Sequence, residues 1–205
     1  MKLYLSSYRL GNNPEKLVNL FSDNKKVAVI ANAIDFVDDF QRKESTKQSI
    51  TELRNLGLFP EEIDLRDYFE KQEELNIRLN NYAAVYVRGG NTFILRRAML
   101  QSGFDNLIKE KDKDPNFIYA GYSAGICVLS PTLHGLELVD DPNIIPQRYN
   151  PEIVWNGLDI VNFSIAPHYK SDHPESGMVD KEVEYFIKHK IPFKTLRDGE
   201  VVIKE

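Results

Sequence analysis

Short apolar runs alternate with longer amphipathic stretches along this chain, a pattern typical of strands alternating with helices. Apolar runs that predict strands cover residues 3–5, 27–31, 62–65, 82–87, 117–120 and 158–165, of which 62–65 is the weakest. Amphipathic stretches that predict helices cover residues 14–21, 46–56, 92–100 and 174–189. The alternation predicts an α/β fold with a mostly parallel sheet sandwiched between helices.

Turn and cap residues divide the chain further. Asn13 and Pro14 indicate a helix start, and Gly57 indicates a helix end. The tail at 193–204 predicts a hairpin around an Asp-Gly turn at 198–199. The long stretch at 131–156 has little periodicity, and such stretches are more often functional than idle. With no internal repeat or linker, we expect one domain over residues 1–205.

Composition and charge narrow the classes of protein. Hydrophobic residues make up 42% and charged residues 28%, which is ordinary for a globular protein. The net charge of −5 and the lack of a basic block argue against binding of nucleic acid. No apolar run approaches the roughly 20 residues of a membrane span, and the apolar start is too short for a signal peptide. The single cysteine, Cys127, fits a reducing compartment. We therefore expect a soluble, cytoplasmic protein with no membrane partner.

Residues 121–125 read Gly-Tyr-Ser-Ala-Gly and lie between a predicted strand and the apolar start of a helix. In this context a Gly-x-Ser-x-Gly turn is typical of a nucleophile elbow. The glycines leave room for a strained corner. The corner lifts the hydroxyl of Ser123 to a helix N-terminus, where backbone N–H groups stabilise negative charge. The pattern favours a catalytic serine over an ordinary strand–helix turn.

A serine hydroxyl needs a base to remove its proton, and that base is usually histidine. Among the four histidines, His168 directly follows a predicted strand, at the sheet edge where α/β sites lie. We favour His168 for this reason. His134, in the irregular stretch, stays an alternative. His173 at a helix start suggests a loop or capping role, and His189 between two lysines suggests a solvated surface residue.

A third group should orient the imidazole. The carboxylates considered between the serine and the favoured histidine are Glu137, Asp140, Asp141, Glu152 and Asp159. Asp140 and Asp141 form the most notable cluster, although Asp-Asp-Pro is also an ordinary loop sequence. The order serine, aspartate, histidine matches that of α/β-hydrolases, but order alone does not identify a fold.

Gly89 and Gly90 follow the predicted strand at 82–87 and open a helix. Their N–H groups are candidates to complete an oxyanion hole, and the alternative is a turn that needs positive φ. The spacing of a phosphate-binding loop is absent, and so is that of metal ligands. Cys127 is expected to face the core. We expect neither a cofactor nor a metal.

Three ordered blocks resemble the signature sequences of the peptidase E (aspartyl dipeptidase) family of serine peptidases. They are residues 87–93 (Val-Arg-Gly-Gly-Asn-Thr-Phe), 121–125, and 163–169 (Phe-Ser-Ile-Ala-Pro-His-Tyr). The closing residues 196–199 are also similar, so the resemblance spans most of the chain. It implies a class I glutamine amidotransferase-like sandwich, an architecture shared with cyanophycinases, with serine in place of the amidotransferase cysteine.

The resemblance implies roles for particular residues. It makes Ser123 the nucleophile and His168 the base. It assigns the oxyanion hole to the N–H of Gly89 or Gly90 together with that of Ala124. The implied activity is hydrolysis of short peptides, including dipeptides with N-terminal aspartate. We expect the protein to be a monomer or a homodimer.

The family's acidic triad member falls after the elbow. Asp140 or Asp141 matches it best, and Glu137 is a weaker match, because the spacing from the serine differs slightly.

Two departures from the family pattern bear on substrate choice. Arg88 replaces the first glycine of a Gly-Gly-Gly-Asn-Thr block. Residues 170–176 lack the arginine with which aspartyl dipeptidases bind the substrate's aspartate side chain. Arg88, Arg148 and Lys170 are the candidate substitutes. The alternatives left open are a non-catalytic ligand-binding or regulatory relative, and an esterase or amidase on the same fold.

Overall fold

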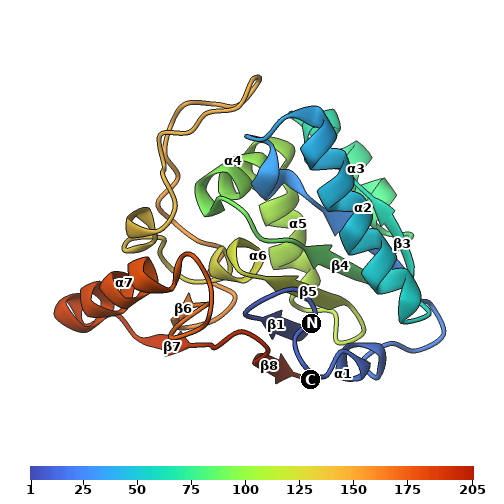
Figure 1. Cartoon of the computed structure of the whole chain (residues 1–205). Coiled ribbons are helices and arrows are strands. Elements are labelled where there is room, and N and C mark those ends of the chain that lie inside the picture. The colour runs from blue at the N-terminus through green and yellow to red at the C-terminus, as the bar shows by residue number, and fades with distance from the viewer.

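A six-stranded sheet lies at the centre of the computed structural model, which describes all residues, 1–205 (Figure 1). The strand order is β3-β2-β4-β5-β1-β8. The strands are β1 (Lys2–Ser6), β2 (Lys26–Ile30), β3 (Phe59–Glu62), β4 (Ala84–Val87), β5 (Ile118–Tyr122) and β8 (Val201–Lys204). The first five are mutually parallel, and β8 runs antiparallel to β1. The predicted mostly parallel sheet is confirmed.

Helices cover both faces of this sheet. The α-helices are α1 (Glu15–Val18), α2 (Asp39–Asn55), α3 (Gln72–Leu79), α4 (Thr92–Ser102), α5 (Phe104–Lys111), α6 (Ala124–Cys127) and α7 (Ser176–His189). Because side chains alternate along a strand, Leu3 and Leu5 of β1 join the core under α3, α4 and α5. Tyr4 between them joins the opposite core under α1 and α2. None of the helices is both long and apolar enough to span a lipid bilayer.

Several element boundaries differ from the sequence prediction. Helix α2 begins at Asp39 rather than at residue 46, because the side chain of Asp38 caps it by accepting from the N–H of Gln41 at 2.9 Å. Strand β3 covers Phe59–Glu62 rather than 62–65, and Leu65 instead opens the short 3-10 helix η2 (Leu65–Tyr68). The helix after Pro14 is a single turn.

The predicted strand at 158–165 is mostly wrong. Only β6 (Ser164–Ala166) forms there, and it lies outside the main sheet. The preceding backbone turns back onto the segment after α6. The N–H of Leu158 donates to the carbonyl of Val128 at 2.8 Å, and that of Ile160 donates to Leu129 at 2.9 Å. These bonds use the groups that a continuous strand would need for its ladder.

The predicted C-terminal hairpin is also wrong. Strand β7 (Phe193–Thr195) pairs in parallel with β6, whereas β8 pairs with β1. The two segments therefore belong to different sheets (Figure 1). The Asp-Gly turn links the sheets and sets Asp198 between them. This crossing brings Asp198 to the ends of β1 and β6.

Hydrogen bonds to α4 hold the irregular stretch at 131–156 in place. This stretch contains the 3-10 helix η3 (Leu136–Leu138). Buried Arg97 of that helix donates to the carbonyls of Pro142, Pro151 and Glu152 at 2.8–3.2 Å. The hydroxyl of Tyr149 donates to the buried carboxylate of Asp35. Hydrogen bonds to α4 and to Asp35 thus hold this segment in place, although it has little regular structure of its own.

Candidate active site

Three adjacent strands end together at the carboxyl edge of the sheet. Ser123 directly follows β5 and Ser7 directly follows β1, whereas Gly89 lies two residues after the end of β4. The carboxyl edge is where parallel α/β sheets hold their reactive groups. The topology thus brings segments far apart in sequence to one place.

Ser123 sits at a strained corner between β5 and α6. Its φ of 49° and ψ of −123° lie in a region that side-chain-bearing residues rarely adopt, and such strain costs about 1–3 kcal/mol. A Cβ on Gly121 would lie 2.8 Å from the carbonyl oxygen of Val87, and one on Gly125 would lie 2.1 Å from it. Both glycines of the pattern are therefore needed, because the end of β4 passes directly against the elbow.

Gly125→Ala should destabilise the protein severely. The new methyl would meet the Val87 carbonyl, which is backbone in the middle of the sheet and cannot swing aside. We expect a loss of at least about 3 kcal/mol, the upper part of the range for overpacked sites, measured by urea unfolding. Gly177→Ala in α7 is the control, because nothing lies within 4 Å of its new Cβ. Equal stabilities of the two variants would contradict the tight approach of β4.

The two glycines after β4 face the elbow. A Cβ on Gly89 would lie 2.8 Å from Cβ of Ser123. Gly90 has a φ of 144°, as the turn interpretation requires, and a Cβ there would meet the carbonyl of Ala33 at 2.5 Å. The N–H groups of both glycines donate to no protein acceptor. Ala124 opens α6, so its N–H has no partner within the helix. These donors are free to stabilise an oxyanion beside the serine.

His168 is held by a carboxylate from the closing turn. Its Nδ1 lies 2.6 Å from Oδ1 of Asp198. The hydroxyl of Ser7 donates to the same oxygen at 2.9 Å and accepts from the backbone N–H of His168 at 2.8 Å. His168 has a φ of 62°, a constrained backbone for a non-glycine residue. Because a carboxylate at Nδ1 keeps the ring proton there, Nε2 is left to accept a proton.

The carboxylates predicted from the sequence lie elsewhere. Asp140 accepts from the N–H of Thr92 at 2.8 Å and so caps α4. Burial raises the pKa of Asp140 to about 6. Asp141 accepts from the N–H of Asn143 at 2.8 Å. Neither shares a hydrogen bond with His168.

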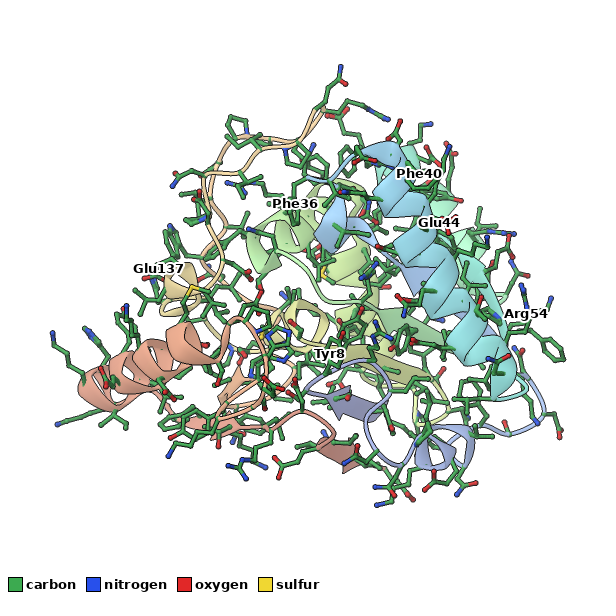
Figure 2. All side chains as sticks on the ribbon, in the orientation of Figure 1. Tyr8, Phe36, Phe40, Glu44, Arg54 and Glu137 are labelled. Atoms are coloured by element: carbon green, nitrogen blue, oxygen red, sulfur yellow. The ribbon has the colours of Figure 1, made fainter.

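Glu137 serves its own loop, because its carboxylate accepts from the N–H of Gly135 at 2.6 Å. Figure 2 shows it well apart from Tyr8, which lines the cavity at the serine. The geometry therefore favours Asp198 over all three of the sequence-predicted carboxylates as the partner of His168.

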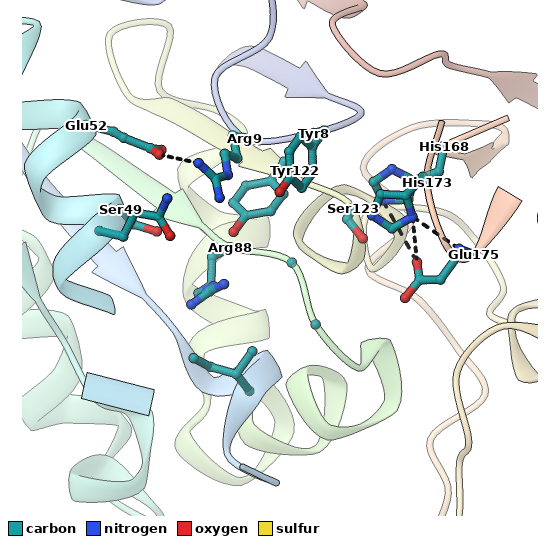
Figure 3. Close-up of a pocket in the computed structure, with 14 residues that line it drawn as sticks. Tyr8, Arg9, Ser49, Glu52, Arg88, Tyr122, Ser123, His168, His173 and Glu175 are labelled. Atoms are coloured by element: carbon teal, nitrogen blue, oxygen red, sulfur yellow. Dashed lines mark hydrogen bonds and ion pairs between the residues drawn. The ribbon is translucent and has the colours of Figure 1, made fainter. Parts of the chain in front are cut away.

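A polar cavity of about 170 Å³ contains both Ser123 and His168. Figure 3 shows Ser123, His168, His173 and Glu175 on one side of Tyr122, with Arg88 on the other. Gly89 and Gly90 also line the cavity. The serine, the histidine and the glycines predicted from the sequence are thus brought together.

Only one of the three candidate cations reaches this cavity. Arg88 lines it, and the Nε and Nη1 atoms of Arg88 are buried without a hydrogen-bond partner. Arg148 instead donates to the carbonyl of Arg66 at 2.8 Å. Lys170 lies over the ring of Tyr169, with Nζ 5.1 Å from its centroid. A second cation that lines the cavity, Arg9, is paired with a glutamate.

The histidines separate into two groups. His168 and His173 line the cavity, and their rings stack with centroids 3.7 Å apart and planes 9° apart. His134 stacks on Trp155, and exposed His189 stacks on a tyrosine of α7. Neither of these two lines the cavity.

The environment of His168 keeps its imidazole neutral. Burial lowers its pKa from the ordinary 6.5, the carboxylate of Asp198 opposes this shift, and nearby His173 adds to it. The net direction is downward. A neutral imidazole is the form that can accept a proton from a serine.

The fall of kcat/KM at acidic pH should reflect the lowered pKa of His168. A base that must be unprotonated loses activity as the pH falls through its pKa. Because the pKa of His168 is lowered, we expect the midpoint of the acidic fall in kcat/KM to lie below pH 6.5. A pH profile of peptide hydrolysis checks this expectation. A midpoint of the acidic fall clearly above pH 6.5 would contradict this expectation.

Sequence reasoning missed two members of this arrangement. The sequence indicates Asp198 as a turn residue within a segment similar to the family, but nothing local to it indicates contact with the histidine. Ser7 belongs to no sequence motif that would indicate a role in the site. A signal for Asp198 did exist, because it lies within residues 196–199, which resemble the closing sequence of the family.

The fold and the elbow place the protein in the class of α/β proteins with a serine at the carboxyl edge of a parallel sheet. The sequence profile of peptidase family S51 matches residues 7–203. The chain therefore belongs to peptidase family S51.

Individual relatives agree with this assignment. The chain is 33% identical over 119 residues to an uncharacterized peptidase of Listeria monocytogenes, a match that covers 58% of this chain and 55% of the relative. It is 32% identical over 128 residues to a "probable alpha-aspartyl dipeptidase" of Drosophila melanogaster, covering 59% and 49%. The matches thus span about half the length of these curated relatives.

Solved structures match the whole chain. A candidate peptidase E from Listeria monocytogenes superposes with a TM-score of 0.74 at 26% identity, covering 100% of this chain and 98% of the other. A peptidase from an acI-B1 actinobacterium gives 0.72 at 15% identity, covering 100% and 83%, and supports the fold alone.

Proposed function

We propose that this protein is a serine peptidase that hydrolyses short peptides. The observation that carries the proposal is the 2.6 Å contact between Nδ1 of His168 and Asp198, on a histidine that shares a cavity with the elbow serine. Family membership supports peptide-bond hydrolysis over other acyl transfers. Asp198 takes the orienting role that the sequence had left to Asp140 or Asp141.

The chemistry follows from these positions. The Oγ of Ser123 attacks the scissile carbonyl while Nε2 of His168 takes its proton, giving a tetrahedral intermediate. N–H groups of Gly89, Gly90 and Ala124 bind the oxyanion. The imidazolium, stabilised by Asp198, then protonates the leaving amine, so that an acyl-enzyme remains. Water, deprotonated by the same histidine, releases the acid and restores the serine.

Cavity size and charge support small substrates with an anionic group. The cavity of about 170 Å³ has room for a small molecule. Arg88 lines the cavity, and its guanidinium forms no ion pair with a carboxylate of the protein, so its charge is available to an anionic group of a substrate. We infer that Arg88 binds the side chain of an N-terminal aspartate, in place of the arginine missing from residues 170–176.

Cleavage of a dipeptide panel tests this function. The panel has N-terminal Asp, Glu, Asn and neutral residues. We expect Asp-X to be cleaved, and Arg88→Gln to lower kcat/KM for Asp-X by about 10–100-fold, as loss of a charged hydrogen-bond partner implies. Neutral dipeptides should be affected much less. Arg148→Gln is the matched control, because Arg148 does not line the cavity. No cleavage of any dipeptide would contradict the proposed function.

A further inference from the structure

A group of metal-ligating side chains lies at the active site. His168, His173 and Asp198 each offer one ligand atom, and these atoms all lie within 4.8 Å of one another. The carboxylate of Glu175 completes the group. Its Oε2 lies 4.0 Å from Nε2 of His168 and 3.9 Å from Nδ1 of His173. Two imidazoles and two carboxylates therefore lie within a few ångströms of one another at the cavity.

We propose that His168, His173 and Glu175 bind a divalent transition-metal ion, Zn²⁺ by preference, and that this ion inhibits the enzyme. Imidazole nitrogen and carboxylate oxygen are the donors that zinc prefers at sites that keep an open position. Zinc bonds of about 2.0–2.2 Å put tetrahedral donor atoms roughly 3.4 Å apart. The present separations of 4.0 and 3.9 Å from Oε2 of Glu175 to the two imidazoles are longer than this, and Nδ1 of His173 now accepts from the backbone N–H of Glu175 at 3.3 Å, so the ion binds only after His173 moves.

The hydrogen bonds of Asp198 and Ser7 already hold His168 in the way that a metal-binding histidine is usually held. Metal-bound histidines usually donate their second ring N–H to a carboxylate, which fixes the ring and strengthens it as a ligand. Asp198 accepts at Nδ1 of His168 in this way, and Ser7 holds Asp198. The bond that prepares His168 as a base therefore also prepares its Nε2 for zinc.

The second histidine must move for the ion to bind. Lone pairs lie in the ring plane, so two rings stacked in parallel cannot both point at one ion. His173 lies in the turns between β6 and α7, and its side chain is 19% exposed. We therefore expect the ring of His173 to turn out of the stack when the metal binds. The catalytic and metal-bound arrangements are alternatives of one site.

Metal binding and catalysis exclude each other in this account. Nε2 of His168 has one lone pair, which either accepts the proton of Ser123 or binds the ion. The inhibition rests on the proposed function, whereas the binding does not. Reversal by a chelator follows, because no covalent bond of the protein changes.

Calorimetry with Zn²⁺ tests the binding directly. Metal-free full-length protein is titrated with zinc chloride at pH 7.5, as the parent, His173→Gln and His189→Gln. His189 is the control because it is exposed and lies outside the cluster. We expect one ion per chain with micromolar affinity, at least about tenfold weaker binding to His173→Gln, and no change for His189→Gln. Absence of binding, or equal binding to the parent and His173→Gln, would overturn the proposal.

A second arm tests the inhibition. Each variant's dipeptide hydrolysis is measured against its own metal-free rate. Zinc should inhibit the parent and His189→Gln at the same concentration, and should inhibit His173→Gln only at a concentration at least about tenfold higher. Excess chelator should restore the parent rate. Zinc that binds without inhibiting an active enzyme would overturn the inhibitory role. A protein that cleaves no peptide but binds zinc through His173 would refute the proposed function and leave the metal site standing.

Discussion

Ser123→Ala should lower kcat/KM for peptide hydrolysis by at least about 10⁴-fold, because the residual rate would come from substrate binding and the oxyanion hole alone. The substitution removes only the hydroxyl. It keeps the Cβ, and therefore the strained φ of 49°, so the elbow should stay folded. Initial rates on a cleaved dipeptide, with far-UV circular dichroism as a check on folding, measure the effect.

Ser130→Ala is the matched control for this variant. Ser130 lies just after α6, is fully buried, and its hydroxyl has no hydrogen-bond partner. Its loss should leave the rate within a few-fold of the parent. If Ser123→Ala cleaved peptides as fast as Ser130→Ala, Ser123 would not be the nucleophile.

Asp198→Asn should lower kcat by about 10⁴-fold with little change in KM. An amide can donate to Nδ1 of His168, which would move the ring proton to Nε2 and leave the base unable to accept a proton. The contact is short, at 2.6 Å, and buried on the histidine side. Steady-state kinetics above and below the KM separate the two parameters.

Asp140→Asn distinguishes the two candidate carboxylates. The amide oxygen can still accept from the N–H of Thr92 at the start of α4, so the helix cap is kept. We expect at most a few-fold loss of kcat. A large loss in Asp140→Asn together with a normal rate in Asp198→Asn would restore the assignment made from the sequence and refute the one made from the structure.

The elements that the sequence predicted well are those whose signals are local. The buried runs that became β2, β4 and β5 are apolar on both faces because helices cover both sides of the sheet. The elbow was readable because its two glycines are required by the close approach of Val87. In each case the physical cause requires particular residue types within a short stretch of sequence, so the sequence alone reveals it.

The errors came from pairing between distant segments. Nothing within residues 193–204 shows that β7 pairs with β6 and β8 with β1, so an Asp-Gly turn there predicts a hairpin. The orienting carboxylate was missed for the same reason. Asp198 is 30 residues beyond His168 in sequence, and only the return of the chain to β1 brings them together. A search confined to the chain order of α/β-hydrolases could not find it.

The residue proposed to select the substrate was predicted only in part. The sequence identified Arg88 as a departure from the family block, but its significance depends on burial. Two of its nitrogens are buried without a hydrogen-bond partner, and the residue lines the cavity that contains Ser123, which no local pattern can reveal. The two other candidate cations, Arg148 and Lys170, do not line the cavity.

The central claim, that Ser123 is an activated nucleophile, is tested most directly by labelling with a fluorophosphonate probe followed by mass mapping of the modified peptide. The account predicts one adduct per chain, on Ser123. Labelling should be abolished in Ser123→Ala and strongly slowed in Asp198→Asn. A peptide-cleaving preparation that the probe labels at another residue, or that keeps its full label in Ser123→Ala, would contradict the account.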